Sequence, residues 1–356
     1  MNATPHSALR AKILAIGTAN PPERYTQQEV LQRFGMENTA IGDIFRAAHI
    51  RTRHLLLPET DAEGRPHDDQ ESLLKKHRQG ALSVGSKAIE GCLARAGLSV
   101  RDIGYLCCIS STGFMMPGLT AMFIRHLGFP TQTQRADIVG MGCNAGLNGL
   151  NPVAAWAQAN PGRYALIVCC EINSAIYLHE ETIATGVVNS LFGDGCAAAV
   201  VSTEQRDMAG APEILGFQSH IVPDHWRAMH YRWRPQQSRF SFHLDREVPY
   251  VLGANIRVPV FALLERFALK TRNISHWVVH SGGKKVIDAV KYAIGLTAHD
   301  VRHTTGILRD YGNLGSGSFL FSYDRLLSEG RVAAGDYGVM MTMGPGSTIE
   351  TALIRW

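Results

Sequence analysis

One cysteine lies where a strand-like run meets glycines and then a helical pattern. The segment runs Ala136-Asp-Ile-Val-Gly-Met-Gly-Cys-Asn-Ala-Gly-Leu-Asn148, with Cys143 at its pivot. A strand that turns sharply into a helix exposes its pivot side chain, and the first helical N–H groups and the helix dipole then stabilise a thiolate there. A buried small hydrophobe is the commoner role of a cysteine, but a plain core strand has little use for glycines at 140, 142 and 146. Cys143 is therefore predicted to be a nucleophile.

Two further side chains occupy the same kind of place. His280 ends the run His276-Trp-Val-Val-His280 before two glycines, and Asn313 stands in a glycine-rich turn before a helical pattern. A histidine at a strand end is more often structural, and an asparagine between glycines is usually a turn residue. Three such residues in one local context are much less expected by chance. A nucleophile needs a proton acceptor and a group that holds developing negative charge, and this trio supplies both.

The elements that must position these residues alternate between strand and helix. Many strands are near-continuous apolar runs, which predicts an α/β fold with a sheet covered on both faces. Two similar halves are expected, 1–210 with the cysteine and 211–356 with the histidine and asparagine, and a polar loop is expected at 59–67. Strands are predicted at Lys12–Ile16, Ile103–Ser110, Ala136–Gly140, Tyr164–Cys170, Cys196–Ser202, Glu213–Ile221, Trp277–Val279, Tyr337–Met343 and Thr348–Ile354. Helices are predicted after the capping box Thr26-Gln-Gln-Glu29 and at Gln79–Leu98, Ala145–Asn160, Val251–Leu269, Lys284–Ile294 and Gly317–Leu327.

Composition narrows the functional classes. The chain has 356 residues and a net charge of +4, without a run of Lys and Arg that would suit nucleic acid. Its seven cysteines form no CxxC pair, and no signal peptide precedes the first strand, so free thiols in a reducing cytoplasm are expected. No apolar stretch approaches the roughly 20 residues of a membrane span. Metal-ligand spacings, a P-loop and a GxGxxG motif are all missing from the sequence, so neither a metal nor a nucleotide cofactor is predicted.

Several motifs extend the Cys, His and Asn pattern. Together they resemble the type III polyketide synthases of the chalcone synthase family, over nearly the whole chain. Leu191-Phe-Gly-Asp-Gly195 and Ser241-Phe-His-Leu244 resemble the segments around two gatekeeper phenylalanines. Gly344-Pro-Gly346 resembles the family's loop near the C-terminus, although Met343 stands where plant members have phenylalanine. Met116-Pro117-Gly118 resembles the segment that crosses to the partner subunit.

The resemblance implies a thiolase-like fold in five αβαβα layers, a homodimer, and a buried site reached by a coenzyme A tunnel. Cys143 would attack a thioester and carry the growing acyl chain. His280 and Asn313 would donate hydrogen bonds to the thioester carbonyl of malonyl-CoA while carbon dioxide leaves and an enolate forms. Phe192 and Phe242 would keep water from these species. Ordinary aromatic packing is the alternative for either phenylalanine.

Coenzyme A needs cationic partners for its phosphates. Arg46, Arg51 and Arg53 lie where the family keeps its phosphate-binding lysines and arginines, and a solvated basic face is an equal alternative. Gly282 and Gly283 would let the backbone approach the pantetheine arm closely. Coenzyme A thioesters are expected as substrates, and no cofactor is expected.

The cavity positions depart from the plant pattern. Asn173 and Ile176 replace two threonines, Gly315 replaces a serine, and Trp233 falls where a glycine lines the plant cavity. Met116 would reach toward the partner's cavity. A cavity narrowed by Trp233 would suit a small starter unit.

Two segments, Gly140–Gly146 and Val187–Gly195, resemble the bacterial subgroup that makes 3,5-dihydroxyphenylacetyl-CoA. Members of that subgroup condense four malonyl-CoA units, one of them serving as starter after decarboxylation, and close the ring through a carbon–carbon bond. The leading hypothesis is the same reaction here. The alternatives are another acyl-CoA starter that leads to a resorcinol or pyrone, a ketoacyl synthase making one condensation, a papain-like cysteine hydrolase and an inactive scaffold subunit.

Overall fold

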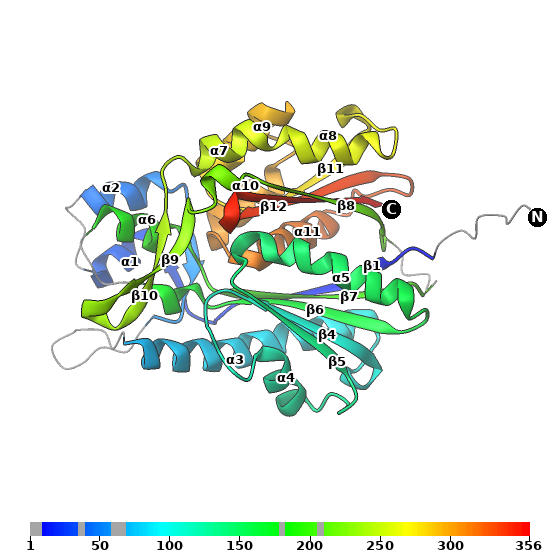
Figure 1. The fold of residues 1–356 in the computed structure, drawn as a ribbon, viewed down its shortest axis with the longest axis horizontal. Coiled ribbons are helices and arrows are strands. Elements are labelled where there is room, and N and C mark those ends of the chain that lie inside the picture. The colour runs from blue at the N-terminus through cyan, green and yellow to red at the C-terminus, as the bar shows by residue number, and fades with distance from the viewer. Residues whose placement is uncertain (1–8, 35–39, 58–68, 178–181, 205–209) are drawn as a thin grey trace, which may run out of the picture.

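The computed structural model describes residues 9–34, 40–57, 69–177, 182–204 and 210–356. Figure 1 shows five layers, in which helices and sheet alternate from the top of the view to the bottom. The outer layers hold α7 (Val248–Asn255), α8 (Arg257–Glu265) and α9 (Lys284–Ile294) on one side, and α3 (Gln70–Ala96) and α4 (Leu119–Leu127) on the other. The middle layer holds α5 (Ala145–Ala159) and α11 (Ser318–Ser328). This is the predicted αβαβα arrangement.

Nine strands form one sheet in the order β11-β12-β13-β8-β1-β7-β6-β4-β5. The pairs β4–β5, β4–β6 and β11–β12 are parallel and the remaining pairs are antiparallel. Only the pair Lys12 and Glu213 joins β1 to β8, so the sheet divides into two parts with the middle helices between them (Figure 1). The strands are β1 (Lys12–Ala19), β4 (Ile103–Ser110), β5 (Gln134–Val139), β6 (Tyr164–Glu171), β7 (Gly195–Ser202), β8 (Glu213–Ile221), β11 (Ile274–Val279), β12 (Tyr337–Gly344) and β13 (Thr348–Arg355).

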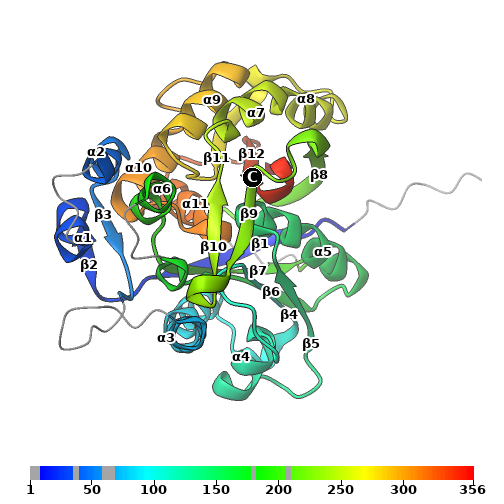
Figure 2. The same cartoon turned by 60° about the vertical axis from the view of Figure 1, so that its left-hand side comes forward.

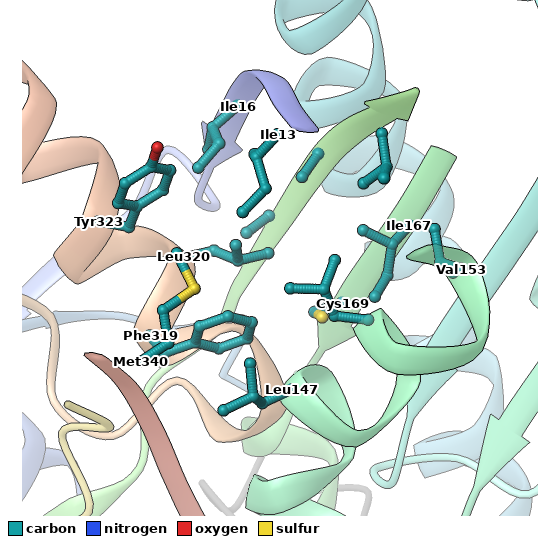
Figure 3. Close-up of a cluster of buried hydrophobic side chains, with 14 of the residues drawn as sticks. Ile13, Ile16, Leu147, Val153, Ile167, Cys169, Phe319, Leu320, Tyr323 and Met340 are labelled. Atoms are coloured by element: carbon teal, nitrogen blue, oxygen red, sulfur yellow. The ribbon is translucent and has the colours of Figure 1, made fainter. Parts of the chain in front are cut away.

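The core between the two parts of the sheet fixes the helices that carry the site. Leu147 on α5 and Phe319 on α11 pack with strand residues such as Ile167 and Met340, and all four are buried (Figure 3). Gly146 permits this approach, since an added Cβ would lie 2.2 Å from the carbonyl oxygen of Ser316. The start of α5 and the turn before α11 are therefore held in direct contact, close to Cys143.

Most predicted elements are present, with two kinds of difference. The capping box is confirmed, because the Glu29 carboxylate accepts from the Thr26 N–H at 2.6 Å and the Glu29 N–H donates to the Thr26 hydroxyl at 3.2 Å. The helix predicted at 251–269 is present as α7 and α8, which meet at Ile256 with helical backbone angles, although it runs from 248 to 265. Sequence patterns missed α2 (Ala40–Ala47), α4, α6 (Ile183–Leu191), α10 (Arg302–Tyr311) and the hairpin of β9 (Met229–Arg234) and β10 (Arg239–Leu244). The remaining short elements are β2 (Arg24–Thr26), α1 (Gln27–Phe34) and β3 (Thr52–His54).

Three other expectations have separate outcomes. Cys170 and Cys196 form a disulfide between neighbouring strands, so the expectation of free thiols is wrong for these two. The boundary expected near residue 210 stays a prediction, and residues 205–209 beside it, like the loop expected at 59–67, lie outside the described ranges. In those ranges one 18-residue window, Val248–Glu265, is apolar enough to cross a membrane, but 44% of it is buried inside the fold.

Candidate active site

The predicted nucleophile lies at the turn between β5 and α5. Gly140 and Gly142 adopt φ values of 81° and 68°, a left-handed region that glycine tolerates. A Cβ on Gly142 would meet the ring of Pro345 at 2.5 Å, and the Gly142 N–H donates to the Ser111 hydroxyl at 2.8 Å. The tight turn therefore presents the partly buried Cys143 side chain to a cavity, as the pattern predicts.

Asn313 faces the sulfur through its side-chain amide. The Cys143 Sγ lies 4.0 Å from the amide, and the Asn313 Oδ1 already accepts from the Gly315 N–H at 2.9 Å. The backbone of Asn313 is fixed by a bridge to Phe192 and by its N–H, which donates to the Leu191 carbonyl at 2.9 Å. Because its oxygen is occupied, the amide has its N–H₂ donors available for a group on the sulfur.

His280 reaches the same end of the sheet through β12. Its N–H donates to the Met341 carbonyl at 2.8 Å, and Gly344, three residues further along β12, packs against the backbone nitrogen of Cys143. The imidazole is buried, and its Nδ1 has no hydrogen-bond partner in the described part of the chain. Among the same residues, the sulfur is hydrogen-bonded to the amide and not to the imidazole. A free ring nitrogen leaves His280 able to accept or donate a proton.

Burial sets the protonation of the cysteine and the histidine. It raises the pKa of Cys143 to about 12, helped by a charged Glu171 and opposed by the Asn313 amide. It lowers the pKa of His280 to about 3. Burial therefore opposes the thiolate that was expected at the helix start, because loss of solvent disfavours its charge. The thiol and the imidazole are therefore both neutral in the resting protein, and of the two Cys143 lines the cavity.

The cavity in front of the sulfur has a volume of about 280 Å³. Both proposed gatekeepers line it, and the rings of Phe192 and Phe242 meet edge to face at 5.8 Å. Phe242 comes from the β9–β10 hairpin, which crosses the end of the layers (Figure 2). Its wall also includes Ser111, Thr112, Gly140, Gly142, Glu171, Asn173, Ile176, Trp226, Met229, His230, Tyr231, Gly315, Pro345 and Gly346.

Comparison with known proteins agrees with this geometry. The model of the chalcone and stilbene synthase N-terminal domain matches residues 2–205, and that of the C-terminal domain matches residues 215–356. The chain belongs to the chalcone and stilbene synthase family. Members of this family are type III polyketide synthases, which are acyltransferases, and this chain is one of them.

Two bacterial members of the family are similar over nearly their full length. The 3,5-dihydroxyphenylacetyl-CoA synthase of Streptomyces toyocaensis is 51% identical over 352 residues, covering 98% of this chain and 90% of the relative. The protein of the same name from Amycolatopsis balhimycina is also 51% identical and covers 97% and 93%.

Solved structures of the family agree as well. PKS-I of the brown alga Ectocarpus siliculosus has a TM-score of 0.91 at 25% identity and covers 99% of this chain and 100% of that one. The 1,3,6,8-tetrahydroxynaphthalene synthase of Streptomyces coelicolor has a TM-score of 0.88 at 28% identity and covers 97% and 99%.

Two residues that the family resemblance suggested for the site lie elsewhere. Arg53 is fully buried and donates to the Phe192 carbonyl at 2.7 Å and to the Gln27 Oε1 at 2.6 Å, so it cannot reach a phosphate at the surface. Trp233 is half exposed on β9 and packs edge to face on Phe240 at 5.1 Å, outside the cavity. The predictions that Arg53 contacts a phosphate and that Trp233 narrows the cavity are therefore wrong.

The remaining predicted residues lie outside the cavity. Arg46 is exposed and pairs with Asp43 at 2.7 Å, and Arg51 is exposed as well. Met116 is 99% exposed. Gly282 lies against the His280 ring and Gly283 faces Leu191. The described residues hold no group of three His, Cys, Asp or Glu side chains arranged as metal ligands.

Sequence patterns did not single out several residues of the cavity wall, among them Glu171 and Tyr231. Glu171 was detectable, because a carboxylate ends the otherwise apolar strand β6, in which every residue is buried. Tyr231 carried no such signal, since the hairpin that presents it was not predicted. Its hydroxyl donates to the Ser111 carbonyl at 2.7 Å, and this bond holds the aromatic ring in the cavity wall.

Proposed function

We propose that this type III polyketide synthase condenses malonyl-CoA repeatedly on Cys143 and closes the chain to 3,5-dihydroxyphenylacetyl-CoA. The observation that carries the proposal is Cys143, which lines a small apolar cavity together with two phenylalanines and whose sulfur lies 4.0 Å from the Asn313 amide. The 51% identity to synthases of that name supports the choice of product.

The roles of the three polar residues follow from their protonation. The Cys143 thiol must lose its proton as sulfur attacks a thioester, and the acceptor assigned here is the buried His280, whose Nδ1 has no hydrogen-bond partner among the described residues. The Asn313 N–H₂ group, with His280, then donates to the carbonyl oxygen of malonyl-CoA while the carboxylate leaves as carbon dioxide. The enolate that forms is stabilised by hydrogen bonds from neutral donors, whereas an added carboxylate would repel it.

The size of the cavity favours a short chain. Pockets for drug-sized ligands span about 300–1,000 Å³, and the volume here is about 280 Å³. Four acetate units make a chain of twelve heavy atoms, which suits this space better than a long fatty acyl starter. Tyr231 and Phe242, at 5.7 Å between ring centres, both line this small space.

Incubation with malonyl-CoA as the only thioester tests the product. We expect an aromatic coenzyme A ester with the mass of a dehydrated tetraketide, and no requirement for another starter. The proposal is rejected if aromatic product forms only after a fatty acyl-CoA is added. A product that contains a single added acetate unit would instead indicate a ketoacyl synthase.

The proposal includes surface contacts with coenzyme A. Arg46 and Arg51 are exposed and would bind its phosphates, while Gly282 and Gly283 would allow the pantetheine arm to approach the backbone. Replacing Arg51 with alanine should raise the KM for malonyl-CoA about tenfold and leave kcat unchanged, since one phosphate contact is worth about 1.4 kcal/mol. The matched control is Arg101→Ala on the same protein, which should change neither constant.

A homodimer is the second part of the proposal. Phe114, Met116 and Val139 are exposed apolar side chains around the edge strand β5, which favours an interface there. Met116→Asp should convert a dimer into a monomer in sedimentation, whereas Val258→Asp, at an exposed site on α8, should not. A wild-type monomer would refute this part. The enzyme would act in the cytoplasm, where the Cys143 thiol stays reduced.

A further inference from the structure

A buried tyrosine next to the proposed gatekeeper Phe192 has no part in the function proposed above. Tyr177 follows the short helical turn Asn173–Ile176, is 1% exposed and packs in one apolar cluster with Phe192 and Phe45. Its hydroxyl donates to the Phe192 carbonyl and accepts from the Arg53 Nη1 at 2.6 Å. The hydroxyl therefore lies between a buried positive charge and the backbone of the gatekeeper.

The groups involved fix the direction of these two hydrogen bonds. A guanidinium has donors and no acceptor, so the Tyr177 oxygen is the acceptor in its bond with Arg53. A hydroxyl has a single proton, and the Phe192 carbonyl receives it. Burial raises the pKa of the Tyr177 hydroxyl, so this proton stays in place at neutral pH. Because the neighbouring charge polarises the O–H group, Tyr177 holds the carbonyl more firmly than an isolated phenol would.

The backbone of Phe192 is paired with that of Asn313. The two residues form an isolated parallel β-bridge. In it the Asn313 N–H donates to the Leu191 carbonyl and the Gly193 N–H donates to the Asn313 carbonyl, both at 2.9 Å. A displacement of Phe192 is therefore passed on to Asn313, whose amide lies 4.0 Å from the Cys143 sulfur.

We propose that Tyr177 is a positioning residue of the synthase, whose hydroxyl holds Phe192 and, through the paired backbone, Asn313 in place. The role rests on the proposed function, because it needs an acyl chain on the Cys143 sulfur and a gatekeeper that keeps water from it. Arg53 also donates to the Phe192 carbonyl, at 2.7 Å, but the same Nη1 has two further acceptors and does not fix that carbonyl alone. One hydroxyl thus supports both the ring at the cavity and the amide beside the sulfur.

The variant Tyr177→Phe tests the role, because it removes one oxygen atom and keeps the ring that packs beside Phe192. Misplacement of a group by about 1 Å costs about 10²-fold in rate, so we expect kcat with malonyl-CoA to fall about 10- to 100-fold. The KM should stay near the wild-type value, since the residues proposed to bind coenzyme A lie outside this network. A displaced gatekeeper admits water, so the ratio of chains shorter than the tetraketide to aromatic product should rise about tenfold, the change that corresponds to one lost hydrogen bond.

A second buried tyrosine provides the matched control. Tyr323, on α11, is fully buried and packs near Trp356 in the core between the two parts of the sheet (Figure 3). Tyr323→Phe removes the same atom and should leave kcat, KM and the product ratio at their wild-type values. The product ratio also separates positioning from stability, because partial unfolding lowers the amount of active enzyme without changing what the folded enzyme makes.

Combining Tyr177→Phe with Phe192→Ala shows whether the tyrosine acts through the gatekeeper. Phe192→Ala removes the ring and should raise the ratio of short chains by itself. Residues that act as one unit do not have additive effects, so Tyr177→Phe should change the ratio in that background by less than about twofold. A further rise of about tenfold would show that Tyr177 acts independently of Phe192 and would overturn the role.

The remaining outcomes are also decisive. A wild-type product ratio in Tyr177→Phe overturns the role, whether or not kcat falls. A variant that does not fold overturns it too, because a positioning role requires the fold to survive the loss of this hydroxyl. The wild type is measured in parallel: if it makes no polyketide from malonyl-CoA, the proposed function is rejected, whereas equal product ratios in wild type and Tyr177→Phe reject only the role of Tyr177.

Discussion

The interior guanidinium of Arg53 should be one of the most sensitive points of the fold. It donates to the Gln27 Oε1 at 2.6 Å, the Tyr177 hydroxyl at 2.6 Å and the carbonyls of Asn189 and Phe192 at 2.5 and 2.7 Å. Arg53→Met keeps the length of the side chain and removes every one of these bonds. Hydrogen bonds to a charged group are worth about 1.5–3 kcal/mol each, and bonds lost together do not add.

A second term comes from the buried Asp194, whose negative charge favours the charged form of Arg53. Asp194 accepts from Leu56 and Ser174 and forms no ion pair with Arg53 among the described residues, so losing this charge adds to the loss of the four hydrogen bonds without setting its size. Because those four bonds do not add in full, we expect Arg53→Met to lower the free energy of unfolding by about 3–5 kcal/mol. Since the Phe192 carbonyl loses one of its donors, the gatekeeper should also move and the rate of product formation should fall.

Urea unfolding followed by tryptophan fluorescence measures the loss. Arg46→Met is the matched control, because that arginine is exposed, and it should change the free energy of unfolding by less than about 0.5 kcal/mol. If Arg53→Met lowers the free energy of unfolding by less than 1 kcal/mol, the buried guanidinium does not hold the segment that carries Phe192 in place.

Other positions give sharp expectations. Gly146→Ala places a Cβ 2.2 Å from the Ser316 carbonyl oxygen and should lower the free energy of unfolding by several kcal/mol or prevent folding. The control Gly91→Ala on helix α3, whose Cβ meets nothing within 4 Å, should raise the free energy of unfolding by about 0.5–1 kcal/mol. Equal melting temperatures of the two variants would contradict this prediction. Because burial raises the pKa of Cys143 to about 12, its thiolate fraction grows tenfold for each pH unit below that value, so alkylation by iodoacetamide should be about 100-fold faster at pH 9 than at pH 7. A rate that levels off below pH 8 would instead indicate a thiolate paired with a charged His280.

The sequence was a good guide to where the three candidate catalytic residues lie, because their surroundings are local. The glycines around Cys143 and Asn313 and the strand before His280 impose turns that short-range backbone preferences determine. The charge state of the pair was not predictable in this way. It depends on how much solvent the hairpin and the neighbouring strands exclude, which is a property of packing between residues far apart in the chain.

The same distinction explains the errors at Arg53 and Trp233. For Arg53 on β3, alternation decides which side chain faces the interior, and polar composition alone does not show it. Trp233 shares a face of β9 with Tyr231, so its distance along the strand from the cavity decides its place. Arg53 points inward because interior carbonyl groups satisfy its guanidinium, a pattern that only the folded chain creates. Trp233 lies beyond Tyr231 on β9, so its ring packs on Phe240 near the surface while Tyr231 reaches the cavity.

Mass spectrometry of the peptide that contains Cys143, after rapid quenching of a reaction with malonyl-CoA, tests the central claim most directly. The account predicts an acetyl group on that cysteine at early times, followed by masses that increase in steps of one ketide unit. Cys92 and Cys107, both buried, should remain unmodified and serve as internal controls. An unmodified Cys143 at every time point, while aromatic product accumulates, would contradict the claim that its sulfur carries the growing chain.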